Sequence, residues 1–120
     1  MSDLTAYELA REAARSAQEK KAEELEILDM RDVSSMADYF VICHGQSGLQ
    51  VRAIGEQVEE GLLRKGVRVW QKEGFDSLHW VVLDYVDVIV HVFSEEKREF
   101  YRLDRLWGDA RIEKVKDEVS

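Results

Sequence analysis

The chain has 120 residues, of which 45% are hydrophobic, so it fits one ordinary globular domain and not a disordered chain. Its formal net charge of −8 argues against an extended grip on a nucleic-acid backbone and is compatible with a basic protein partner. The single cysteine, Cys43, excludes a disulfide within the chain, and no apolar run reaches the length of a membrane span. The N-terminus lacks the pattern of a targeting segment, so we expect a cytoplasmic protein.

A helix is predicted close to the N-terminus. Thr5 and Glu8 form a capping-box pattern, and small apolar residues then recur at helical spacing along one face. This face is thin and rich in alanine, which suits close packing of the helix on a sheet. The residues that form it are Ala6, Leu9, Ala10, Ala13 and Ala17.

Two strands and a second helix are expected next. Residues 25–30 form a short strand, and the continuous apolar run at 39–43 is typical of a strand covered on both faces. Ser47 is placed to cap an amphipathic helix that Gly66 is placed to end. A further strand near residues 67–71 would complete a βαβ unit.

A β-hairpin is predicted in the last third, with strands at 80–83 and 88–93. Alternation along the second strand places its valines on one face and Asp87, Ile89, His91 and Phe93 on the other. Short helices are expected over residues 94–107. We therefore predict a single α/β domain over 1–110, with a mixed sheet of about five strands and flanking helices. Residues 111–120 are predicted to form a charged C-terminal tail or a frayed helix.

No residue pattern points to catalysis. The histidines show no metal-ligand spacing, and Cys43 lies in an apolar run that would raise its pKa and lower its reactivity. We expect no catalytic residue, no metal and no cofactor. The turn at residues 45–48 leaves a nucleotide-binding or nucleotidyltransfer enzyme open as an alternative, because a helix N-terminus can hold an anion. The turn matches neither a P-loop nor a dinucleotide fingerprint, so a simple strand-to-helix connection is favoured.

Six of the eleven aromatic residues gather in the hairpin and the segment that follows it. Trp and Tyr beside acidic residues are typical of protein interfaces. We expect Phe93, Phe100 and Trp107 in the core, and an interface role is as plausible as a core role for Trp80 and Tyr85. A dimeric regulatory module that uses this hairpin as its own interface is a further alternative.

Several motifs occur together and in a fixed order. Trp80-Val-Val-Leu-Asp-Tyr-Val-Asp-Val-Ile-Val-His-Val-Phe93 is followed by Arg98-x-Phe-Tyr-x-Leu-x-x-Leu-Trp107. Upstream lie Leu28-Asp29, Ser34-Ser-Met-Ala-Asp-Tyr-Phe-Val-Ile42 and Gln50-Val-x-Ala-Ile54. In this combination, which extends from about Leu9 to Ala110, the chain closely resembles the Iojap family of ribosomal silencing factors.

The resemblance implies a nucleotidyltransferase-like topology without its active site, because no Asp-x-Asp strand follows the Gly-Gln-Ser turn at residues 45–47. It implies binding to the large ribosomal subunit through large-subunit ribosomal protein fourteen. The bound factor sterically blocks subunit joining and represses translation. Free members are often homodimers. Little direct contact with nucleic acid and none with a membrane is expected.

Carried over to this chain, the family's contact surface implies partner-binding roles for seven residues. Trp80 and Tyr85 would be apolar anchors, while Asp84 and Asp87 would orient the turn or meet basic side chains. Family members commonly have glycine where this chain has Val86, and valine disfavours positive φ, so the turn is expected to differ in type. The seven residues are Trp80, Asp84, Tyr85, Asp87, Ile89, His91 and Tyr101.

Overall fold

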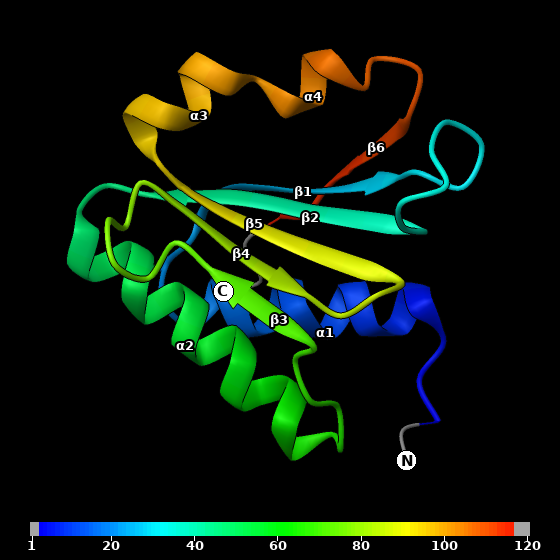
Figure 1. Ribbon diagram of the computed structural model, residues 1–120, viewed down its shortest axis with the longest axis horizontal. Coiled ribbons are helices and arrows are strands. Elements are labelled where there is room, and N and C mark those ends of the chain that lie inside the picture. Colours follow the sequence, from blue (N-terminus) through cyan, green and yellow to red (C-terminus); the bar gives the residue numbers. More distant parts are fainter. Residues whose placement is uncertain (1–2, 117–120) are drawn as a thin grey trace.

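A computed structural model describes residues 3–116 and contains one six-stranded sheet (Figure 1). The strands are β1 (Glu23–Asp29), β2 (Tyr39–Gly45), β3 (Gln71–Glu73), β4 (Trp80–Asp84), β5 (Val88–Ser94) and β6 (Arg111–Lys114). Their order in the sheet is β3-β4-β5-β2-β1-β6. The central strands β2 and β5 pair in parallel, and every other neighbouring pair is antiparallel. The mixed sheet agrees with the prediction, with one strand more than expected.

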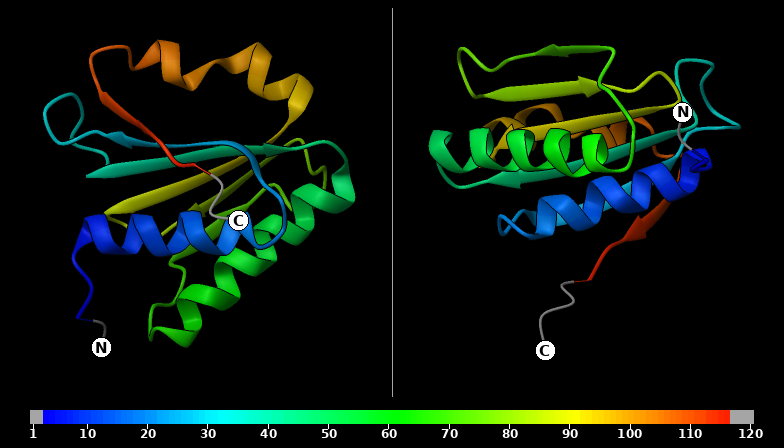
Figure 2. Two further views of the ribbon diagram at one scale, coloured as in Figure 1. Left: turned by 180° about the vertical axis from the view of Figure 1, so that it is seen from behind. Right: turned by 90° about the horizontal axis from the view of Figure 1, so that it is seen from below.

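Helices cover both faces of this sheet. Helices α1 (Ala6–Gln18) and α2 (Gly48–Arg64) lie on one face, and α3 (Glu95–Tyr101) and α4 (Leu103–Leu106) lie on the other (Figures 1 and 2). Each face therefore has its own apolar core. Among the residues that the structure describes, no helix combines the length and the apolar composition that a membrane span requires.

The alternation predicted for the second hairpin strand is confirmed in β5. Val88, Val90 and Val92 belong to the core beneath α1 and α2, whereas Ile89 and Phe93 belong to the core beneath α3 and α4. All of these side chains are buried. The strand is apolar on both faces because helices cover both faces of the sheet at its centre.

The predicted caps of the two long helices are also confirmed. Thr5 Oγ1 accepts a hydrogen bond from the Glu8 backbone N–H, and Glu8 accepts one from the Thr5 backbone N–H. Ser47 Oγ accepts from the Gln50 backbone N–H at the start of α2. Gly66, at φ +83°, follows the end of α2 in the left-handed conformation that glycine adopts without strain.

The predicted strand at residues 67–71 is wrong as the parallel partner of β2. The chain after α2 runs to the edge of the sheet, where β3 begins at Gln71 and pairs antiparallel with β4. The parallel partner is β5, which the chain reaches only after β3 and β4. An interior strand needs two apolar faces, and the segment with Arg68 and Trp70 exposed cannot supply them.

The predicted C-terminal tail is wrong for residues 111–114, which form β6 and pair with β1 at the opposite edge of the sheet. Glu113 ties this strand to α1, since it accepts hydrogen bonds from Tyr7 Oη at 2.6 Å and Arg11 Nη1 at 2.7 Å. An edge strand pairs through its backbone and can carry charged side chains outward, so its composition resembled that of a tail. Residues 117–120 lie outside the described residues.

Helices α1 and α2 approach each other closely through small residues. Ser16, which is buried, faces Gly61 across the contact, and a Cβ at Gly61 would overlap the Ser16 hydroxyl. This contact lets the alanine-rich face of α1 settle on both α2 and the sheet.

We predict that Gly61→Ala lowers the free energy of unfolding by about 1–3 kcal/mol, because the added methyl group forces the two helices apart. Helix propensity alone would give the opposite sign. Urea denaturation measures the change. The control is Gly48→Ala at the start of α2, where the new Cβ would make only ordinary contact with Leu78. Equal stability of the Gly61 variant and the wild-type chain would contradict the prediction.

Candidate functional site

Trp80, the first residue of β4, lies half-buried on the face of the sheet that carries α3. Its indole Nε1–H donates a hydrogen bond to Nδ1 of His91 over 3.1 Å. The indole stacks on Phe93 at a centroid distance of 5.0 Å and contacts the exposed Tyr101 ring at 4.7 Å. Three partners therefore hold one large aromatic side chain in a single orientation while part of it remains in contact with solvent.

His91 supports Trp80 from within the core. Burial lowers the pKa of His91 to about 3, so the ring is neutral at physiological pH. Because Nδ1 accepts the indole hydrogen bond, the ring hydrogen is on Nε2, which is buried and has no hydrogen-bond partner among the described residues. The ring also meets Phe40 edge-on at 4.7 Å. His91 therefore positions Trp80 and is not itself exposed.

The turn between β4 and β5 is strained at Val86. This residue has φ +73° and is 57% exposed. Asp84 Oδ1 accepts the Val86 N–H at 2.8 Å, and the Tyr85 carbonyl accepts the Asp87 N–H at 2.9 Å, which closes a γ-turn around Val86. Valine thus takes the positive φ that it disfavours, at a cost of about 1–3 kcal/mol, in a turn that both flanking hydrogen bonds stabilise.

Tyr85 is not on the surface that presents Trp80. It is 8% exposed and packs in the core beneath α1 and α2, on the opposite face of the sheet. Burial raises the pKa of its hydroxyl, which has no hydrogen-bond partner in the described part of the chain. Trp80 and Tyr85 are separated by an odd number of positions along an extended strand, so the alternation itself contained this information.

The seven residues predicted to bind a partner therefore do not form one surface. Asp87 and Tyr101 are exposed, and Trp80 and Asp84 are partly exposed. The expectation of a shared surface is wrong for three side chains, because β4 or β5 directs them into the two cores; they are Tyr85, Ile89 and His91. Whether any of the seven touches a partner stays a prediction.

A buried charged cluster, not predicted from the sequence, anchors α3 to the sheet. The Arg98 guanidinium donates to Glu26 Oε1 at 3.1 Å, to the Glu23 carbonyl at 3.2 Å and to His44 Nδ1 at 3.1 Å. The Arg98, Glu26 and His44 side chains are all nearly inaccessible to solvent. Sequence separations of 54 and 72 residues between Arg98 and its two side-chain partners hid the cluster from sequence analysis.

This cluster does not suit a metal ion, although one donor atom from each of Glu23, His44 and Glu95 lies within 4.8 Å of the others. A guanidinium can only donate, so Nδ1 of His44 carries the lone pair that accepts from Arg98. The ring hydrogen must then be on Nε2, facing Glu23 at 3.5 Å and Glu95 at 3.9 Å. A metal would need a lone pair at that nitrogen, so the cluster is better explained as a structural anchor.

The turn at residues 45–48 is occupied by local hydrogen bonds. The Gln46 backbone N–H donates to Gln50 Oε1 at 2.7 Å, the Gln46 side chain donates to Glu23, and Ser47 caps α2. The neighbouring carboxylate would repel a phosphate. Cys43 is fully buried, and burial raises its pKa to about 12, as the sequence predicted. These features do not favour the nucleotide-dependent alternative.

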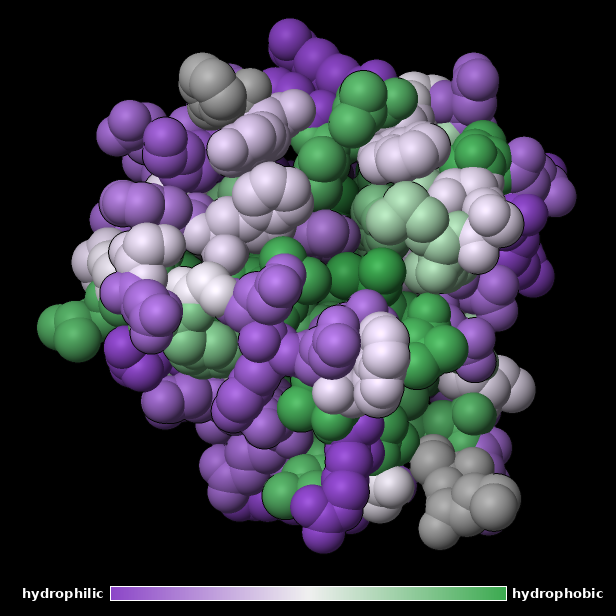
Figure 3. All heavy atoms as spheres, in the orientation of Figure 1, coloured by the Kyte–Doolittle hydropathy of each residue, from purple (hydrophilic) through white to green (hydrophobic). Residues whose placement is uncertain are grey.

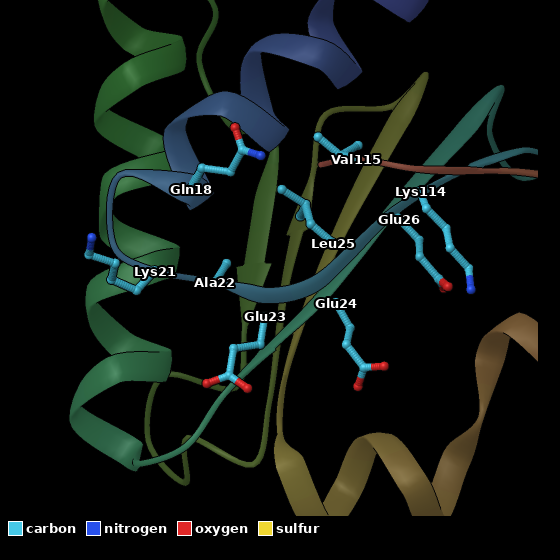
Figure 4. A pocket seen from close by; sticks show the side chains of 9 residues that line it. All are labelled: Gln18, Lys21, Ala22, Glu23, Glu24, Leu25, Glu26, Lys114 and Val115. Carbon is cyan, nitrogen blue, oxygen red and sulfur yellow. The ribbon is translucent and has the colours of Figure 1, made fainter. Parts of the chain in front are cut away.

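A cavity of about 300 Å³ lies beside the buried charged cluster, because Glu23 and Glu26 are among the residues that line it. It opens between the end of α1, the start of β1 and β6, with Gln18, Leu25 and Val115 at one end and Glu23 and Glu24 at the other (Figure 4). Lys21, Glu26 and Lys114 also line it, and its charged side chains converge on no common point (Figure 4). In the view of Figure 3, apolar side chains are visible in the middle of the face, and hydrophilic side chains predominate around its edge.

Taken together, the mixed sheet, the two helical layers and the restrained, partly exposed Trp80 define a small α/β domain with an ordered aromatic side chain at its surface. Comparison with known proteins identifies the family. The family model described as "Ribosomal silencing factor during starvation" matches residues 3–120. The chain therefore belongs to the ribosomal silencing factor family, RsfS.

Individual relatives agree with this assignment. The chain is 46% identical over 100 residues to the ribosomal silencing factor of Bacillus subtilis, covering 83% of this chain and 85% of the relative. It is 38% identical to that of Halalkalibacterium halodurans, over 98% of this chain and all of the relative. A Chromobacterium violaceum crystal structure superimposes with a TM-score of 0.85 at 28% identity, over 98% of this chain and 95% of that one. The chloroplastic Iojap protein of Zea mays is 28% identical over 90% of this chain and 47% of that protein.

We predict that Arg98→Met lowers the free energy of unfolding by about 3–5 kcal/mol, because it leaves Glu26 buried without its guanidinium. Adding Glu26→Gln to Arg98→Met should recover part of the loss, since the buried carboxylate that has lost the guanidinium is then replaced by a neutral group. Chemical denaturation of the two single variants and the double variant measures this coupling.

The control is Arg64→Met, which breaks an exposed pair with Glu60 and should change stability by less than about 0.5 kcal/mol. If Arg98→Met were as mild as Arg64→Met, the buried anchor would not stabilise α3.

Proposed function

We propose that this chain binds the large ribosomal subunit through large-subunit ribosomal protein fourteen and thereby blocks joining of the small subunit. Family membership over residues 3–120 supports the ribosomal role. The observation that carries the contact site is Trp80, whose indole is held by His91, Phe93 and Tyr101 and is still partly exposed. A large aromatic side chain with little freedom left to lose is the kind of residue that dominates binding energy at an interface.

Charge favours the same partner class. The chain carries 25 acidic and 17 basic residues, and Asp84 and Asp87 stand beside the Val86 turn at one end of β4. A basic ribosomal protein would meet a complementary field, which speeds encounter and fixes orientation. The contact surface that we propose consists of Trp80, Asp84, Val86, Asp87 and Tyr101. The buried residues Tyr85, Ile89 and His91 would support it from below.

The mechanism that follows is steric. A folded domain of 13.9 kDa that covers the subunit-joining face of the large subunit leaves no room for the small subunit. Such a mechanism needs affinity and position, and it requires no bond making or breaking. We propose that the chain is a regulatory protein and not an enzyme, that it acts in the cytoplasm, and that it represses translation in this way.

We predict that the chain pellets with large subunits and not with small subunits in co-sedimentation at near-physiological salt. Trp80→Ala should weaken binding by about 2 kcal/mol, or roughly thirty-fold, because the central anchor is lost. Trp80→Phe keeps an aromatic ring but loses the indole N–H, so its affinity should lie between that of the wild-type chain and that of Trp80→Ala.

The matched control is Ile112→Ala on β6, which truncates another partly exposed apolar residue at the far edge of the sheet. Thermal melting confirms that each variant is folded. Wild-type pelleting with no subunit would contradict the proposed function. Equal binding by folded Trp80→Ala and wild type would remove Trp80 from the contact surface.

We also propose that the free chain forms a homodimer. The exposed apolar side chains of the Trp80 region give a second copy something to bury. Sedimentation velocity should give a mass of two chains at high concentration and one on dilution. A single chain at every concentration would contradict the dimer and leave the ribosomal proposal intact.

A further inference from the structure

The segment between α2 and β3 has a charge opposite to that of the whole chain. Four cations fall within nine residues, from Arg64 to Lys72, with no acidic residue between them, although the net charge of the chain is −8. Trp70 lies in the same segment. The four cations are Arg64, Lys65, Arg68 and Lys72.

The fold turns the polar and aromatic side chains of this segment outward. Val67 and Val69 are partly buried and pack against the core beneath α1 and α2, so Arg68 and Trp70, which alternate with them, project to solvent. Trp70 is 64% exposed, compared with 42% for Tyr101. Figure 1 shows the end of α2 and this connection at the bottom of the molecule, on the side of the sheet away from α3.

Two of the four cations are not neutralised. Arg64 pairs with Glu60 at 3.0 Å, and Lys72 pairs with Glu59 at 3.0 Å. Lys65 and Arg68 are exposed and have no ion-pair partner among the described residues. Arg68 and Trp70 are two positions apart in the chain, so their Cα atoms are separated by at most roughly 7 Å.

We infer that Lys65, Arg68 and Trp70 form a contact site for a single-stranded stretch of ribosomal RNA. The inference rests on the proposed function, which brings the chain to the large subunit. Two free cations can neutralise adjacent phosphates, and the open face of an indole stacks on a base of any sequence. An acidic peptide would form ion pairs with the two cations, but its carboxylates would not stack on the Trp70 indole.

The position of this site supports a joint contact. The Trp70 backbone N–H donates to the Asp84 carbonyl at 2.9 Å, and Asp84 Oδ1 accepts from Val86. The RNA site therefore adjoins the turn that we assign to the ribosomal protein. A bound chain would touch protein through Trp80 and the turn, and RNA through the Trp70 segment, which lies beside the turn.

The experiment measures binding of the full chain to purified large subunits over a series of potassium chloride concentrations. The test variants are the double substitution Lys65→Gln and Arg68→Gln, and separately Trp70→Ala. The matched control removes two cations from the remote strand β6, by Arg111→Gln and Lys114→Gln. The four cations in the test pair and the control pair are all exposed, so the two pairs are matched. Thermal melting checks that each variant is folded.

The Lys65 and Arg68 double variant should reduce the slope of log affinity against log salt by about 1.4, since each phosphate contact on a single strand contributes about 0.7. The control pair should leave the slope nearly unchanged. Trp70→Ala should weaken binding roughly ten-fold or more without changing the slope, because stacking is not ionic. Ultraviolet cross-linking should join the peptide containing Trp70 to ribosomal RNA.

Three results would overturn the inference while leaving the proposed function in place. In the first, the wild-type chain binds large subunits, but the test pair and the control pair give the same slope of log affinity against log salt. Another is unchanged affinity of folded Trp70→Ala. The third is a cross-link from this peptide to a ribosomal protein alone, which would identify an acidic protein partner in place of RNA. Failure of the wild-type chain to bind large subunits would overturn both the proposed function and this inference.

Discussion

The parallel pairing of β2 with β5 is the constraint on which the rest of this structure depends. Both strands are buried along nearly their whole length, so helices must cover both faces of the sheet. Parallel strands also require a long crossover, and here the crossover contains α2, β3 and β4. The register between β4 and β5 then places Trp80 opposite Phe93. The position of the candidate surface is thus a consequence of how the central strands are joined.

The two central strands each carry one buried histidine toward α3, and each histidine accepts a hydrogen bond through Nδ1. His44 on β2 accepts from Arg98, which fastens α3 to the sheet. His91 on β5 accepts from Trp80, which fixes the indole on the surface. In both cases a polar group inside an apolar layer is retained because it orients a neighbour. Helix α3 and Trp80 also touch each other through Tyr101, so the two anchors stabilise one arrangement.

Local signals in the sequence predicted local structure well. The capping pattern at Thr5 and Glu8, the end of α2 at Gly66 and the alternation along β5 each depend on neighbouring residues, and each is confirmed. The choice of β5 as the partner of β2 depends on competition between distant segments, which periodicity cannot rank. The edge strand β6 was missed because its charged side chains need no core.

The site was predictable only in part, for a related reason. The motifs identified the family correctly, but a motif does not say which side chains face solvent. Counting positions from Trp80 along β4 places Tyr85 on the other face, whereas the anchoring role of Arg98 depends on partners far away in the sequence. Burial then separates the residues that can touch a partner from those that hold them in place.

Net charge alone is a poor guide to the partners that one part of a surface can bind. The excess of acidic residues describes the average field and argues against an extended grip on RNA. A contact that uses two phosphates and one base needs only the charge within a Debye length, about 8 Å at physiological ionic strength. In this segment Arg64 and Lys72 are already paired with glutamates, so the local positive charge that remains is that of Lys65 and Arg68. An acidic domain can therefore meet a basic protein with one part of its surface and RNA with the part beside it.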